Sequence, residues 1–100
     1  MKKIVCYDLH SVTDSSVYSS IKEDIEKKYP KSVYILNTTY LIYTSDSTNT
    51  IFENIKYILT RRAGQNNFEF FTSKYSEEQG WLQNTKWDKI KDKLKSSTYY

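Results

Sequence analysis

Residues 3–10 decide how the rest of the chain is interpreted, and they read Lys3-Ile4-Val5-Cys6-Tyr7-Asp8-Leu9-His10. Apolar residues occur at both alternating sets of positions, which is typical of a central β-strand buried on both faces. Ile4, Cys6 and Asp8 point to one face, because successive side chains of a strand alternate. The stretch ends with an acid and the single histidine of the chain. It therefore predicts a buried strand that carries a carboxylate and an imidazole to its end.

Length and composition restrict the class of protein. One hundred residues fit one domain, which we place at residues 1–95, with a frayed tail at 96–100. A single cysteine excludes an intrachain disulfide. We see no leader peptide and no apolar run of the roughly 18 residues that span a bilayer. We therefore expect a cytoplasmic protein with no membrane partner.

Charge and residue usage say little about a ligand. A net charge of +3 is ordinary solubilising charge, so it neither requires nor excludes nucleic acid. Ten tyrosines, 13 lysines and only two glycines are typical of an A+T-rich genome. Tyrosines are therefore not taken as functional on frequency alone.

Hydrophobic periodicity predicts the order strand, helix, strand, strand, helix, strand and a last helix. We expect strands near 3–9, 32–37, 39–45 and 67–73. Helices are predicted near 14–29, 50–60 and 86–95, capped by Thr13 or Asp14, by Thr50 and by Thr85. This is the α+β order of a ferredoxin-like βαββαβ sandwich with an appended C-terminal helix. That helix or a second copy of the chain must cover the second sheet face.

The same patterns predict which side chains are buried. Phe52 is placed on the inner face of the second helix, and Phe71 in a half to fully buried fourth strand. Cys6 lies among apolar residues and is expected to be inert core. Residues 60–66 are predicted to be a loop, which would hold both arginines of the chain.

Three short motifs resemble one protein family. Tyr7-Asp8-Leu9, the strand Thr39-Tyr40-Leu41-Ile42-Tyr43-Thr44 and Gly80-Trp81-Leu82 are similar to the small CRISPR adaptation-subunit family and its SinR-like and VapD-type relatives. The resemblance implies a homodimer formed through the sheet. In some members the acid that ends the first strand serves a metal-dependent nuclease, and in others it is scaffold. The chain departs from the family at Tyr40, where SinR-like proteins usually have tryptophan, and in residues 61–67, which lack the usual aspartates.

Asp8 is the candidate catalytic and metal-binding residue. Two copies in a homodimer can hold one divalent cation, Mg²⁺ or Mn²⁺, whose bound water attacks a phosphodiester. His10 is a candidate base or ligand beside it, but the sequence offers no third group to complete a site. The alternative is that Asp8 accepts backbone N–H bonds or caps the first helix. We expect this alternative, and hence no cofactor.

Arg61 and Arg62 are the candidate residues for nucleic-acid or phosphate binding, because a guanidinium contacts phosphate with two parallel hydrogen bonds. The lysines of the last helix form a stripe through Lys86, Lys89 and Lys93. Asp88 and Asp92 lie beside that stripe, so we interpret it as a solvated face.

We favour a small homodimeric binding protein without turnover. The resemblance and the composition together indicate a phage or mobile-element inhibitor of a host CRISPR-type nucleic-acid complex, with a protein of that complex as partner. One alternative is a metal-dependent nuclease of the CRISPR adaptation-subunit or VapD type. The other is a CRISPR adaptation scaffold subunit that binds DNA.

Overall fold

The computed structural model describes residues 1–77 and 79–94, so the prediction for 96–100 lies outside the described residues. The elements follow as β1 (Lys2–Leu9), α1 (Ser15–Lys28), β2 (Ser32–Leu36), β3 (Thr39–Tyr43), α2 (Thr48–Ala63), β4 (Phe68–Lys74) and α3 (Asn84–Leu94). The predicted order of elements is confirmed. The chain is an α+β protein with one four-stranded antiparallel sheet, compatible with a ferredoxin-like fold. No helix of the described residues is long and apolar enough to cross a membrane.

The sheet has the order β2-β3-β1-β4, so the first strand of the chain is central. β1 pairs with β3 on one side and with β4 on the other, both antiparallel. In this register Cys6 lies opposite Phe71, and Asp8 lies opposite Glu69. The predicted alternation of β1 is confirmed, but its burial on both faces is not: Val5, Tyr7 and Leu9 are buried, whereas the other face is half-buried at Ile4 and Cys6 and exposed at Asp8.

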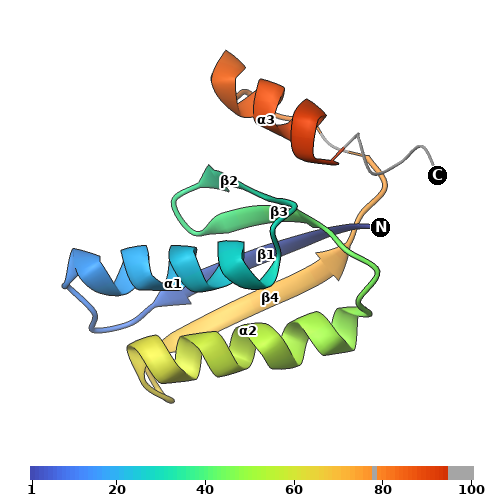
Figure 1. The fold of residues 1–100 in the computed structure, drawn as a ribbon. Coiled ribbons are helices and arrows are strands. Elements are labelled where there is room, and N and C mark those ends of the chain that lie inside the picture. Colours follow the sequence, from blue (N-terminus) through green and yellow to red (C-terminus); the bar gives the residue numbers. More distant parts are fainter. Residues whose placement is uncertain (78, 95–100) are drawn as a thin grey trace.

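The main core lies between one sheet face and the helices α1 and α2 (Figure 1). Ile21 and Ile25 of α1 and Ile55 and Leu59 of α2 are fully buried there. Tyr40 is fully buried against them from β3, at the position where the resemblance leads us to expect tryptophan. Burial also raises the pKa of its neighbour Tyr7 to about 12. The apolar faces that the sequence predicted for the first two helices therefore form this core.

A second core lies on the other sheet face, beneath α3. Val33 of β2 and Leu41 of β3 pack against Ile90 and Leu94 of α3. Figure 1 shows α3 on the side of the sheet away from α1 and α2, above β2 and β3. The final helix therefore covers the β2–β3 half of this face.

Two caps differ from those predicted. α1 begins after Asp14 as expected, but the cap of α2 is Ser47, whose Oγ accepts a hydrogen bond from Thr50 N at 3.1 Å. Thr50 is therefore the third residue of the helix, because a serine three residues earlier satisfies its N–H. Thr85 likewise lies inside α3, which takes its first backbone bonds at Gln83 O.

The loop predicted for 60–66 is wrong, because α2 continues to Ala63 and includes both arginines. The helix ends where Gly64 adopts a φ of 95°, a left-handed conformation that a side chain disfavours.

Two aromatic side chains are also less buried than predicted. Phe52 is 39% exposed, at the edge of the helix layer beside Phe70. Phe71 is 62% exposed, because it points to the sheet face that α3 leaves open beside β1 and β4.

Candidate functional site

Asp8, His10 and Glu69 form a cluster where β1 ends and β4 begins. Asp8 and Glu69 face one another across the two strands, and His10 follows the end of β1. One ligand atom from each of the three side chains lies within 4.8 Å of the others, and all three residues are exposed. His10 Nε2 is 3.6 Å from Glu69 Oε2. We call this group the carboxylate–histidine cluster.

Backbone geometry places His10 over β4. Its N–H donates a 2.8 Å hydrogen bond to Asn67 O, which extends the β1–β4 ladder by one residue. Ser11 then adopts a φ of 59°, so the chain turns away from the sheet directly after the histidine. The imidazole is therefore held beside the first residues of β4.

The cluster has the chemistry of a divalent-cation site. Carboxylate oxygens and an imidazole nitrogen are ligands for Mn²⁺ and similar metals. Two like charges directly opposite on neighbouring strands are also unfavourable without a cation between them. The sequence pointed to Asp8 and His10 but missed Glu69. Glu69 alternates with two phenylalanines of β4, and only the strand register reveals that it faces Asp8.

The contacts expected for Asp8, backbone N–H bonds or a cap on the first helix, are not seen among the described residues. Asp14 caps α1 instead, because its Oδ1 accepts a hydrogen bond from Ser16 N at 2.9 Å. This backbone bond lowers the pKa of the Asp14 carboxyl. Among the described residues we find no hydrogen bond to the Asp8 carboxylate. Asp8 is therefore free to bind a ligand.

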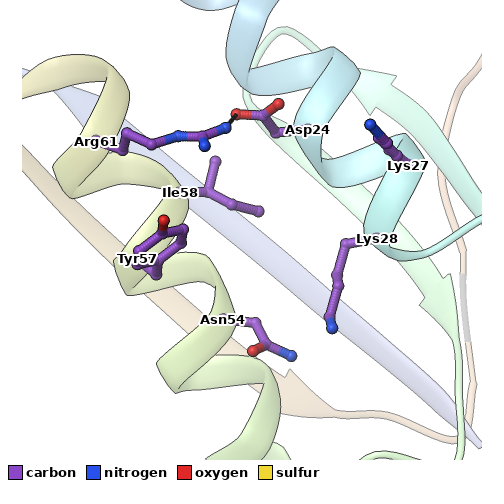
Figure 2. A pocket seen from close by; sticks show the side chains of 7 residues that line it. All are labelled: Asp24, Lys27, Lys28, Asn54, Tyr57, Ile58 and Arg61. Atoms are coloured by element: carbon purple, nitrogen blue, oxygen red, sulfur yellow. Dashed lines mark hydrogen bonds and ion pairs between the residues drawn. The ribbon is translucent and has the colours of Figure 1, made fainter.

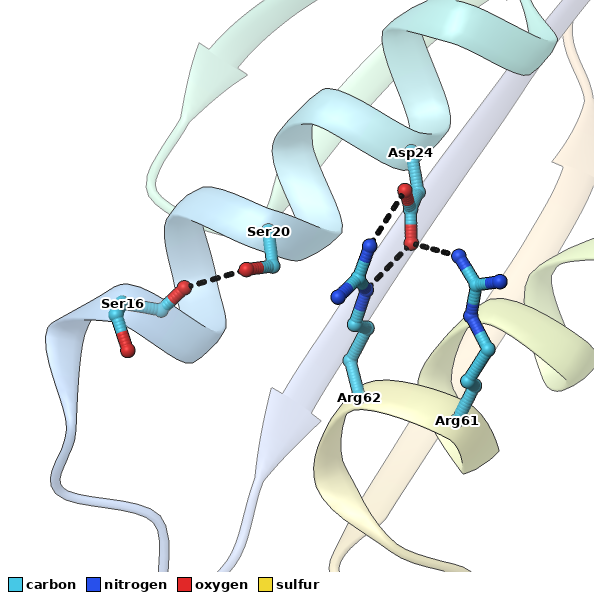
Figure 3. Close-up of polar contacts among 5 residues, drawn as sticks. All are labelled: Ser16, Ser20, Asp24, Arg61 and Arg62. Carbon is cyan, nitrogen blue, oxygen red and sulfur yellow. Dashed lines mark hydrogen bonds and ion pairs between the residues drawn. The ribbon is translucent and has the colours of Figure 1, made fainter.

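Arg61 and Arg62 are brought together on one acid. Arg62 contacts both carboxylate oxygens of Asp24, with Nε 2.7 Å from Oδ2, and an Arg61 nitrogen lies 3.1 Å from Oδ2 (Figure 3). The hydrogen bonds from Arg62 are the main reason why the pKa of Asp24 is lowered. The two arginines thus join α2 to α1. Phosphate binding by them stays a prediction.

The lysine stripe of α3 is partly structural. Lys86 Nζ lies 2.6 Å from Ile35 O, and Lys93 Nζ lies 3.4 Å from Ser32 O. Both carbonyls belong to β2, which is an edge strand of the sheet. These lysines therefore occupy acceptors that would otherwise be open to another strand.

The half of the sheet that α3 does not cover carries a small apolar patch between the acids Asp8 and Glu69 at one end and Ser73 at the other, and we call it the open sheet face. It includes Phe71 and the half-buried Cys6, whose Sγ lies 3.5 Å from the hydroxyl of Thr39. Cys6 is thus not enclosed core. Next to it, at Ile4, begins a hollow of about 380 Å³ beneath α3. Trp81, at the rim of this hollow, is fully exposed.

Comparison with known proteins gives no relative for this chain: no family model, no curated protein and no solved structure matches it significantly.

Proposed function

We propose that this protein acts by binding, as a homodimer whose copies meet through the open sheet face. The observation that carries the proposal is Phe71, a large aromatic side chain 62% exposed, which lies opposite the half-buried Cys6 on the open sheet face. Contiguous exposed apolar surface is typical of interaction sites, and aromatic residues are enriched in interface cores. Leu36, which lines the hollow beneath α3, is also 53% exposed.

A second copy is the occupant that fits this face best. A two-fold interface is self-complementary, so a projection on each copy has to meet a recess on the other. Trp81 projects fully into solvent, and the apolar hollow of about 380 Å³ lies beside it. Trp81 of one copy can therefore fill the hollow of the other. This exchange buries two indole rings in the two-fold interface.

The strand order and the two helices on one face support assignment of the fold to the ferredoxin-like sandwiches. The resemblance of the sequence to the CRISPR adaptation-subunit family suggests the class of partner. We propose a CRISPR-type nucleic-acid complex of a host defence system as the target of the dimer. A DNA-binding scaffold role in adaptation is the alternative within the same class.

Phe71→Lys tests the dimer, with Tyr57→Lys as the matched control. Both rings are similarly exposed, at 62% and 64%, but Tyr57 lies on α2, on the other side of the sheet. We expect Phe71→Lys to weaken self-association by about 30-fold or more, which is the effect of losing an interface hot spot of about 2 kcal/mol. Light scattering across a concentration series measures this. A wild-type protein that stays monomeric at micromolar concentration contradicts the proposal.

The carboxylate–histidine cluster supports a second candidate function, a metal-dependent nuclease. Asp8 and Glu69 would hold Mg²⁺ or Mn²⁺, with His10 as a further ligand or as the base for the attacking water. When bound, the cation would supply Lewis-acid activation of a water for phosphodiester hydrolysis, in which the P–O bond to the leaving alcohol breaks. The cluster lies beside Phe71, so the proposed dimer would bring two clusters to one interface.

Metal-linked stability distinguishes this candidate. Mn²⁺ at about 100 times its Kd should stabilise the wild type by about 2.7 kcal/mol. This corresponds to a Tm increase of roughly 10 °C or more in a small domain. Glu69→Gln should abolish the increase, and Glu53→Gln on the exposed side of α2 should keep it. Equal responses of both variants would argue against the site.

Without metal, Asp8→Asn should leave the protein as stable as the wild type or slightly more stable. The substitution removes a carboxylate that directly opposes Glu69, and we expect a gain of a few tenths of a kcal/mol. Urea unfolding in the presence of a chelator measures this gain. A loss above about 1 kcal/mol would restore the structural role that the sequence suggested. In a nuclease, the same variant would also lose metal-dependent cleavage.

A further inference from the structure

Positive charge gathers in a hollow between α1 and α2, on the side of the sheet away from the open sheet face. The hollow has a volume of about 350 Å³, and we call it the interhelix groove. Figure 2 shows its lining, which includes Lys27 and Lys28 from α1 and Tyr57 and Arg61 from α2. Ile58, almost fully buried, supplies an apolar wall. The groove is therefore a cationic recess with one apolar side.

Most of this charge is uncompensated. Asp24 is the one acid that lines the groove within the described chain, and Arg62 already contacts both of its carboxylate oxygens. The positive charge of Arg61, which contacts the same carboxylate, is therefore not balanced by a second acid in the groove. Neither Lys27 nor Lys28 has an ion pair within residues 1–77 and 79–94. Three cations therefore remain for an anionic ligand.

Glu26, the acid next to Lys27 on α1, does not cancel this surplus. Glu26 lies one residue before Lys27, but both of its oxygens contact Lys22 Nζ, at 3.2 and 3.0 Å. In Figure 2, Lys28 extends from α1 across the gap toward α2. An anion in the groove can therefore contact cations from both helices.

Tyr57 adds a stacking surface to this charge. Its side chain is 64% exposed, and Arg61 Cζ lies 5.7 Å from its ring centroid. An exposed aromatic ring among cations is the combination that binds single-stranded nucleic acids, because the cations contact phosphates and the ring stacks on a base. A volume of about 350 Å³ lies near the lower limit of small-ligand pockets, about 300 Å³. It suits one nucleotide unit rather than a duplex.

We propose that the interhelix groove binds a nucleotide unit of a single-stranded nucleic acid. Lys27, Lys28 and Arg61 contact its phosphates, and its base stacks on Tyr57. Arg62 acts as a positioning residue, because it neutralises Asp24 and leaves Arg61 available. The site is independent of the proposed dimer, since it lies on the opposite side of the sheet.

Two substitutions give distinct signatures in fluorescence anisotropy with a labelled single-stranded oligonucleotide of about 10 nucleotides. Lys28→Ala should weaken binding and reduce the slope of log K against log salt by about 0.7, the contribution of one phosphate contact. Tyr57→Ala should weaken binding roughly 5- to 150-fold, the loss of one stacked base, and leave the slope unchanged.

Lys91→Ala is the matched control, because it removes the same charge from an exposed position on α3. It should change neither affinity nor slope appreciably, and circular dichroism should show that all variants are folded. Equal weakening by Lys28→Ala and Lys91→Ala would indicate non-specific attraction and overturn the proposal. Absence of binding in the wild type at low salt would overturn it as well.

A free mononucleotide offers the same phosphate and base as one unit of a strand. A second titration distinguishes these two ligands. Adenosine monophosphate and inorganic phosphate are added to labelled protein, and amide shifts are followed by NMR. If the mononucleotide shifts the amides of Lys28 and Tyr57 and binds with the same affinity as the oligonucleotide, the ligand is a free nucleotide. Tighter oligonucleotide binding at the same residues identifies a strand. Shifts confined to other residues overturn the proposal.

Discussion

Ile55→Ala is expected to lower the free energy of unfolding by about 2–5 kcal/mol. Ile55 is fully buried at the middle of α2, where the helix packs on the sheet. The substitution removes the side chain from the main core and leaves a cavity that a sheet and two helices cannot easily collapse. Small domains have total stabilities of about 5–15 kcal/mol, so the variant is expected to be near its unfolding threshold.

Urea unfolding followed by circular dichroism measures this loss. Ile55→Val keeps most of the side chain and should cost about 0.5–1.5 kcal/mol. Tyr57→Ala, two residues away on the exposed side of the same helix, should change stability by less than about 0.5 kcal/mol. If Ile55→Ala were no more destabilising than Tyr57→Ala, this result would contradict the burial of Ile55 between α2 and the sheet.

Ile90→Asp is expected to release α3 from the sheet. Ile90 is 2% exposed and packs with Val33 and Leu41. An unpaired carboxylate in this position would cost several kcal/mol, which is more than the loss of one helix contact. α3 has 11 residues, and isolated helices shorter than about 12–15 residues are marginal in water. The helix should therefore leave the sheet and unfold, while the main core stays intact.

Hydrogen exchange across Asn84–Leu94 measures this release directly. We expect the amides of α3 to lose their protection and a hydrophobic dye to bind the uncovered β2 and β3. Lys91→Asp, at the next residue on the exposed side of α3, should change neither signal. If the α3 amides of Ile90→Asp stay protected from exchange, the packing of Ile90 on Val33 and Leu41 does not hold α3 on the sheet.

The sequence predicted the structure correctly where the spacing of apolar residues within a single strand or helix determined which side chains are buried. The alternation in β1 predicted that Val5 and Asp8 lie on opposite faces, and the alternating burial of the strand confirms it. The helical spacing of Ile21 and Ile25 likewise predicted the inner face of α1. These patterns are local, so they can be read without knowledge of the partner strand or helix.

The remaining features depend on what lies opposite. Phe71 and Phe70 are identical residues in adjacent positions, and only the position of α3 shows that one of them is left exposed. Glu69 joins Asp8 through a register between segments about sixty residues apart, which no local pattern contains. Ser47 and Thr50 both suit a helix cap, and the tertiary structure selects the earlier residue.

The central place of β1 has a consequence for the order in which the chain can fold. β1 comprises the first residues of the chain, yet one of its two neighbours is β4, which ends at Lys74. During synthesis from the N-terminus, one edge of β1 therefore stays unpaired until β4, about sixty residues later, has been made. Pairing of such distant segments is slow because a long loop must close first. The nascent protein is thus most prone to aggregation before β4 leaves the ribosome, and a slower stretch of translation there would prolong that risk.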